Sequence, residues 1–201
     1  MKTFLIKVGK IAAWTFGVLV VLFIALVIYR IPAVGQKEKA AEAVTRIHAA
    51  ELTLDTVMGN RLPLPPNEEE NNATVAGIDN NGNGIRDDVE LAIFAKYPNS
   101  AKIRAAELQY ALALQLMITE VFDKETWIAA AEMLSRGDAC IGLTVPNTDL
   151  TTYLKRSKEV EDTVLNISIR KNAEDEAYNF ITSYGLPNTD LCDVDLNTLS
   201  G

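Results

Sequence analysis

The chain has 201 residues, enough for one domain and a membrane segment, and its 19 basic and 27 acidic residues give a net charge of −8. Residues 1–30 contain four basic residues and no acid, so residues 31–201 carry a net charge of −12. An acidic domain repels the phosphate backbone, which excludes nucleic acid as an expected partner. It attracts divalent cations instead.

An uncharged apolar run extends from Ile11 to Tyr29. As a helix it would be about 28 Å long, close to the thickness of the bilayer hydrocarbon. A cleaved signal peptide would have a shorter apolar region followed by small residues, whereas Arg30 and Pro32 follow this run. We therefore favour an uncleaved transmembrane anchor over residues 1–30, with the membrane as a partner.

The flanking charges predict the orientation of this anchor. Lys2, Lys7 and Lys10 precede the apolar run. Arg30 follows it, and then come Lys37 and Lys39 with Glu38 between them. Positive charge favours the cytoplasmic side, so we expect a single-pass inner-membrane protein with a cytoplasmic N-terminus and a periplasmic domain.

Cys140 and Cys192 are the two cysteines. An even number of cysteines outside the cytoplasm predicts one Cys140–Cys192 disulfide. The alternative is a pair of unrelated buried thiols.

Two segments separate the anchor from the main domain. Residues 31–60 form a predicted membrane-proximal stalk helix with a thin apolar stripe, ended by Gly59. Residues 61–78 contain three prolines and a run of acidic residues and form a predicted extended linker.

Residues 79–201 form the predicted helical domain. Apolar side chains recur at steps of three and four residues, and no segment alternates like a strand. We expect helices over 85–97, 101–122, 149–169 and 172–184, the second of them with Ser100 as its N-cap. Another helix is expected to begin at an Asp123 cap and to end at Gly137. The predicted fold class is all-α: an N-terminal transmembrane helix plus an irregular bundle of about five short helices with one calcium loop.

The segment that predicts chemistry is 79–90, Asp-Asn-Asn-Gly-Asn-Gly-Ile-Arg-Asp-Asp-Val-Glu. It fits the pattern D-x-[DN]-x-[DN]-G-x5-E, in which alternating oxygen side chains surround Ca²⁺ and a glycine allows a sharp turn. The alternative is an Asn/Gly-rich turn that caps the next helix, which would need neither Asp79 nor Glu90. The expected ligands are Asp79, Asn81, Asn83, Ile85 through its backbone carbonyl, Asp87 and Glu90.

Over these twelve residues the chain resembles two families. The spacing is similar to that of the EF-hand loop. The ending Gly-Ile-Arg-Asp-Asp-Val-Glu, with an apolar residue directly after the glycine, resembles the loops of thrombospondin type-3 repeats and their bacterial relatives. The resemblance implies the same ligand roles for the six residues above.

The role expected of the ion is structural. Asn81 and Asn83 replace two carboxylates of an all-aspartate loop, so we expect a dissociation constant of roughly 10⁻⁴ M. The ion would stabilise the junction between the linker and the helix that starts at Ile85.

Catalytic patterns are missing from the sequence. The single histidine is His48, and no HExxH, GxSxG or phosphate-binding glycine loop occurs. We therefore expect no enzyme, but a membrane-anchored extracytoplasmic calcium-binding protein. The alternative is an assembly subunit of a cell-envelope complex, a homo-oligomer or a partner of another envelope protein, associating through its membrane and stalk helices.

Overall fold

The computed structural model describes the backbone of residues 2–185 and 190–200, and their side chains except those of 2–13, 28 and 31–33. Within these ranges all regular elements are helices and no strand occurs, which confirms the all-α prediction. The chain divides into two compact units, Met1–Ala41 and Glu42–Gly201.

The first unit consists of most of helix α1 (Lys2–Ala49), which joins the predicted anchor and most of the predicted stalk in one helix. The large apolar side chains described in this unit are exposed, as shown by Trp14 at 78%, Phe23 at 68% and Tyr29 at 80%. Among the residues with described side chains, no helix is both long and apolar enough to cross a membrane. Positions 1–13 and 28 of the predicted anchor lie outside those residues.

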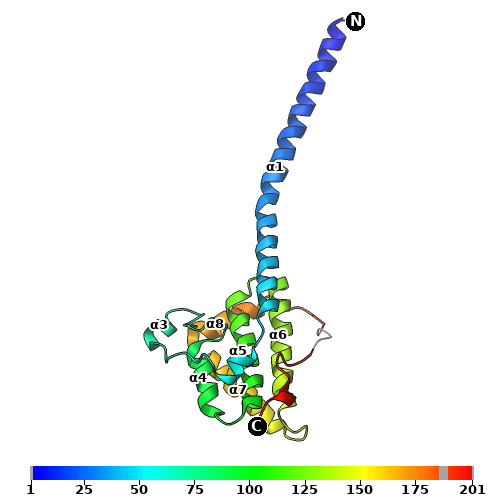
Figure 1. The fold of residues 1–201 in the computed structure, drawn as a ribbon. Coiled ribbons are helices and arrows are strands. Elements are labelled where there is room, and N and C mark those ends of the chain that lie inside the picture. The colour runs from blue at the N-terminus through cyan, green and yellow to red at the C-terminus, as the bar shows by residue number, and fades with distance from the viewer. Residues whose placement is uncertain (1, 186–189, 201) are drawn as a thin grey trace. The chain divides into compact units, whose positions relative to one another are not determined.

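The second unit is built around α5 (Figure 1). Every residue from 104 to 115 is buried, so α5 is covered on all sides rather than along one stripe. The helices that contact α5 are α2 (Leu54–Met58), α4 (Asp87–Lys96), α6 (Lys124–Leu143), α7 (Leu150–Val164) and α8 (Ser168–Tyr178), and α5 itself spans Ala101–Glu120. Two shorter elements complete the unit: α3 (Glu68–Asn72) and the 3-10 helix η1 (Leu196–Thr198).

Local capping explains where several of these helices begin and end. Ser100 accepts a hydrogen bond from the backbone N–H of Ile103 and starts α5, and Asp123 forms a capping box that starts α6. Gly59 ends α2 in the left-handed region, with φ 73°. Ser100 and Asp123 have the capping roles that the sequence predicted. Gly59 ends a helix as predicted, but this helix is the separate α2, because residues 50–53 interrupt the predicted stalk helix 31–60.

Gly137 does not end α6, contrary to the sequence prediction. A Cβ atom at Gly137 would lie 2.8 Å from Cα of Tyr110, so the missing side chain lets α6 pack closely on α5. The helix therefore continues to Leu143. The helices predicted over 149–169 and 172–184 correspond to α7 and α8, which are both shorter than predicted. The segment 61–78, predicted as an extended linker, contains the short helix α3.

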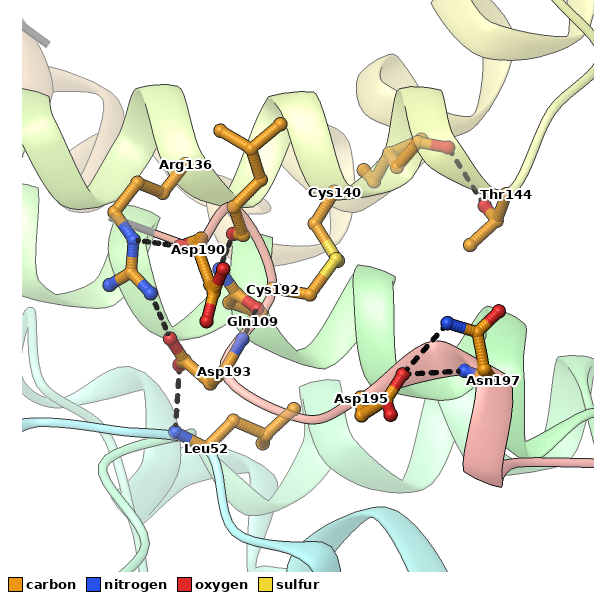
Figure 2. The surroundings of a disulfide bond; sticks show 12 residues. Leu52, Gln109, Arg136, Cys140, Thr144, Asp190, Cys192, Asp193, Asp195 and Asn197 are labelled. Carbon is orange, nitrogen blue, oxygen red and sulfur yellow. Dashed lines mark hydrogen bonds and ion pairs between the residues drawn. A yellow bond between two sulfur atoms is a disulfide. The ribbon is translucent and has the colours of Figure 1, made fainter. Parts of the chain in front are cut away.

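The Cys140–Cys192 disulfide is present and ties the C-terminal tail to α6 (Figure 2). The tail is also held by Asp193, whose carboxylate accepts hydrogen bonds from Arg136 Nη2 at 2.7 Å and from the Leu52 backbone N–H at 2.9 Å. Gln109 of α5 pairs through both ends of its amide with the backbone of Leu191 and Asp193. The irregular C-terminal tail is therefore attached to α5, to α6 and to the backbone of Leu52.

Candidate metal centre

The predicted calcium loop lies between the linker and α4, and its two ends are joined. The Asp87 backbone N–H donates to the carbonyl of Ile78 at 2.8 Å, and the Ile78 N–H donates to Oδ1 of buried Asn71 at 2.9 Å. A closed loop of this kind needs no further ordering of its ends before it binds a ligand.

Asp79 shapes the first half of the loop. One of its carboxylate oxygens accepts hydrogen bonds from the backbone N–H groups of Gly82 at 2.8 Å and Asn83 at 3.2 Å, and the other accepts from that of Gly84 at 2.8 Å. Gly82 and Gly84 have φ of 69° and 83°, values that side chains rarely allow. The glycines therefore let the chain wrap around one carboxylate, which itself remains exposed.

Glu90 closes the other side of the loop from α4. It is 1% exposed, and its Oε2 accepts a hydrogen bond from Asn81 Nδ2 at 2.8 Å. Burial raises the pKa of Glu90, the side-chain amides of Asn81 and Asn83 oppose this shift, and the negative charges of Asp79 and Asp87 add to it. Nδ2 of Asn83 is buried without a hydrogen bond of normal geometry.

Asp87 is fully buried at the start of α4. Its Oδ1 accepts from the Asn80 backbone N–H at 3.0 Å and its Oδ2 from Asn80 Nδ2 at 2.6 Å. Its position also suits the N-terminus of a helix electrostatically. Asp87 is thus bonded to a residue that the sequence did not single out.

Among the described residues, no positive side chain forms an ion pair with these carboxylates. In the ion pairs formed by the described residues, Asp79, Asp87 and Glu90 do not take part. The described part of the chain also contains no group of three or more His, Cys, Asp or Glu side chains arranged to hold a metal ion. The loop thus gathers two buried carboxylates, Asp87 and Glu90, two amides and the exposed carboxylate of Asp79, without a compact three-carboxylate cluster among the described residues.

The remaining predicted ligands are Asn81, Asn83 and the backbone carbonyl of Ile85. Asn81 and Asn83 point their amides at Glu90, and each Oδ1 accepts a backbone N–H two residues later, from Asn83 at 3.2 Å and Ile85 at 2.8 Å. The Ile85 side chain is buried in the main apolar core. The loop is therefore packed against the domain as well as bonded within itself.

Arg86 lies within this loop and is a second residue that the sequence pattern did not single out. It is fully buried, donates to the carbonyls of Thr163 and Val164 at 3.0 Å, and pairs with Asp88 at 2.5 Å. A guanidinium there satisfies the unpaired carbonyls that end α7. A sequence signal existed, since Arg86 stands where an EF-hand has an apolar residue.

Arg170 of α8 anchors the approach to the loop. It is fully buried and donates to the carbonyl of Val75 at 3.2 Å and to Oδ1 of Asn72 at 3.1 Å. Burial, followed by the positive charge of Arg86, lowers the pKa of Arg170 to about 10. Arg170 therefore holds the segment before the loop, and Arg86 holds the loop itself against the end of α7.

Comparison with protein-family models, with curated proteins and with solved structures finds no match to this chain.

Proposed function

We propose that this protein binds one calcium ion in the loop 79–90, that the ion is structural, and that residues 1–30 anchor the domain in a membrane. The observation that supports the calcium site is buried Glu90, which has two negative neighbours and no positive partner. A buried carboxylate without a counter-charge is costly, and a bound cation removes that cost.

The residues present fit a calcium ion, because the donors are oxygens from carboxylates, amides and a backbone carbonyl. Asp79, Asn81, Asn83, the Ile85 carbonyl, Asp87 and Glu90 would hold it. Nδ2 of Asn83 is buried beside Glu90 without a hydrogen bond of normal geometry, so the protein alone does not satisfy this part of the site.

Calcium would tie together the parts that meet at this loop. Asn81 Nδ2 also donates to the carbonyl of Arg61 at 3.1 Å, and Gln115 of α5 donates to the carbonyl of Ala76 at 2.9 Å. An ion that orders Asn81 and Glu90 therefore stabilises the contact of the linker with α4 and α5. This supports a structural role rather than that of a switch.

The anchor rests on the uncharged run from Ile11 to Tyr29 and on the exposed apolar side chains of α1. The disulfide supports a domain in an oxidising compartment, because such bonds persist outside the cytoplasm. Alkaline carbonate extraction of membranes from cells expressing the full chain checks this. The chain should stay in the membrane pellet, and its release into the supernatant would contradict the anchor.

The exposed apolar side chains of α1 equally favour the alternative of an assembly subunit. Light scattering of the full chain in detergent micelles separates the two, since an anchor alone gives a monomer. A stable dimer or larger oligomer favours the assembly role.

Calorimetric titration of the detergent-solubilised chain with calcium chloride tests the site. At a dissociation constant of roughly 10⁻⁴ M, about 1 mM calcium adds about 1.4 kcal/mol to the free energy of unfolding and raises the melting temperature. Glu90→Gln should abolish both the heat and the shift, whereas Glu69→Gln, at an exposed position outside the loop, should keep them. No heat and no shift with the natural chain would refute the proposal.

A further inference from the structure

The segment Arg61–Pro66 reads Arg-Leu-Pro-Leu-Pro-Pro and has no regular secondary structure from Leu62 onward. Each proline holds φ near −65°, and each residue before a proline is restricted to extended backbone. This combination favours the polyproline II helix, which has three residues per turn and no internal hydrogen bonds.

Burial along the segment repeats every third residue. Pro63 and Pro66 are half-buried, while the four residues between and before them are exposed. One face of a three-residue helix thus rests on the domain, and the other two faces are turned outward. Leu64, 83% exposed, is the most exposed large apolar side chain described in the second unit.

Both ends of the segment are held by the fold. Asn60 donates to Asp55 at 2.6 Å just before it, and Asn67 caps α3 just after it by accepting from the Glu70 N–H at 3.1 Å. The carbonyl of Arg61 accepts from Asn81. A partner therefore meets a segment with little backbone freedom left to lose.

Other ways of covering these side chains fit poorly. The prolines lack the N–H groups needed to extend the edge of a sheet. An anionic membrane is disfavoured because Glu68, Glu69 and Glu70 follow directly. One arginine precedes the prolines and three glutamates follow them, so the two ends of the segment carry opposite charges. This charge pattern favours one of the two orientations in which a partner could bind the segment.

We propose that Arg61–Pro66 is a docking segment for a protein domain whose groove is lined by aromatic side chains. Leu62, Leu64 and Pro65 would enter the groove, because polyproline II segments dock by inserting apolar side chains between aromatic rings. A carboxylate of the partner would pair with Arg61. This inference does not depend on calcium binding.

The test uses the full chain with ¹⁵N-labelled leucine in detergent micelles. It is titrated with two probes that have such grooves, a WW domain and a Src-homology-3 domain. The amide signals of Leu62 and Leu64 should shift saturably, while those of Leu143 and Leu150, also exposed and apolar, should not. Leu64→Ser should weaken binding roughly tenfold, and the matched Leu150→Ser less than about twofold.

Failure of both probes to shift the Leu62 and Leu64 signals overturns the proposal. It is also overturned if Leu64→Ser and Leu150→Ser weaken binding equally, because the contact would then be unspecific apolar adhesion. Both leucines are exposed, so neither variant is expected to impair folding.

Discussion

Two regions of this protein, the C-terminal tail and the candidate metal centre, each contain a buried carboxylate, and the two carboxylates have different partners. Asp193 in the C-terminal tail has a side chain 1% exposed and is paired with Arg136 and the Leu52 N–H. Glu90 at the candidate metal centre is also 1% exposed, but it has an amide donor and two negative neighbours. A buried charge is costly without a counter-charge. Asp193 has one in Arg136, whereas the ion pairs of the described residues give Glu90 none, and the proposed calcium ion would supply it.

The largest effect should come from the covalent part of the tail. Replacing both Cys140 and Cys192 by alanine should lower the free energy of unfolding by about 4 kcal/mol, because the bond restricts a 52-residue separation in the unfolded chain. Urea unfolding measures this, and reduction of the natural chain should reproduce it. A loss below about 1 kcal/mol would mean that the polar contacts alone hold the tail.

Breaking the Arg136–Asp193 ion pair should lower the free energy of unfolding slightly less than loss of the disulfide does. Arg136→Met leaves Asp193 buried with one backbone donor and should lower the free energy of unfolding by about 3 kcal/mol. The control is Arg46→Met, which breaks an exposed pair with Glu120 and should cost under about 1 kcal/mol. Equal losses in the two variants would remove the contrast between buried and exposed pairs.

The turn of the loop can be tested with its two glycines. Gly82→Ala and Gly84→Ala both place a side chain at positive φ, but only the Cβ at Gly84 meets another residue, Leu112 Cδ1 at 2.7 Å. We expect losses of about 1 kcal/mol for Gly82→Ala and about 2 kcal/mol for Gly84→Ala in thermal unfolding. Equal losses would show that contact with α5 adds nothing to the backbone strain.

The smallest expected change is an increase in the free energy of unfolding, in the variant Glu90→Gln. In calcium-free buffer at pH 7, Glu90→Gln should raise the free energy of unfolding by about 0.5 to 1 kcal/mol, because it removes a buried negative charge without a partner. Thermal melts with and without calcium measure this. If the variant is less stable than the natural chain even without calcium, Glu90 is satisfied by the protein alone.

The same charge predicts a pH dependence. Because burial raises the pKa of Glu90, the native state binds its proton more tightly than the unfolded state does. The stability contributed by Glu90 is then fully present below its unfolded pKa and is lost as pH rises through the folded pKa. The advantage of Glu90→Gln should therefore be absent at about pH 4 and grow towards pH 7.

Much of the fold could be predicted from local signals. The caps at Ser100 and Asp123 and the helix stop at Gly59 depend on neighbouring residues, so the sequence identified them. Gly137 was misread because a glycine that ends a helix and one that admits a neighbouring helix look alike in sequence. What distinguished them was Tyr110 on α5, which is distant in the chain.

The candidate site divides in the same way. The order of Asp79, Asn81, Asn83 and Glu90 is a local pattern. The disulfide joins distant residues, but it could be expected because the chain has only two cysteines. The burial of Arg86 and Arg170, and the pairing of Asp193 with Arg136, depend on which helix ends and loops meet around α5. The sequence by itself determined that the fold is helical, where Ser100 and Asp123 cap helices, and which oxygen side chains the loop carries, because these features arise between residues close in the chain. Only packing decided which charges are buried and which have partners, because burial and partnership depend on residues far apart in sequence.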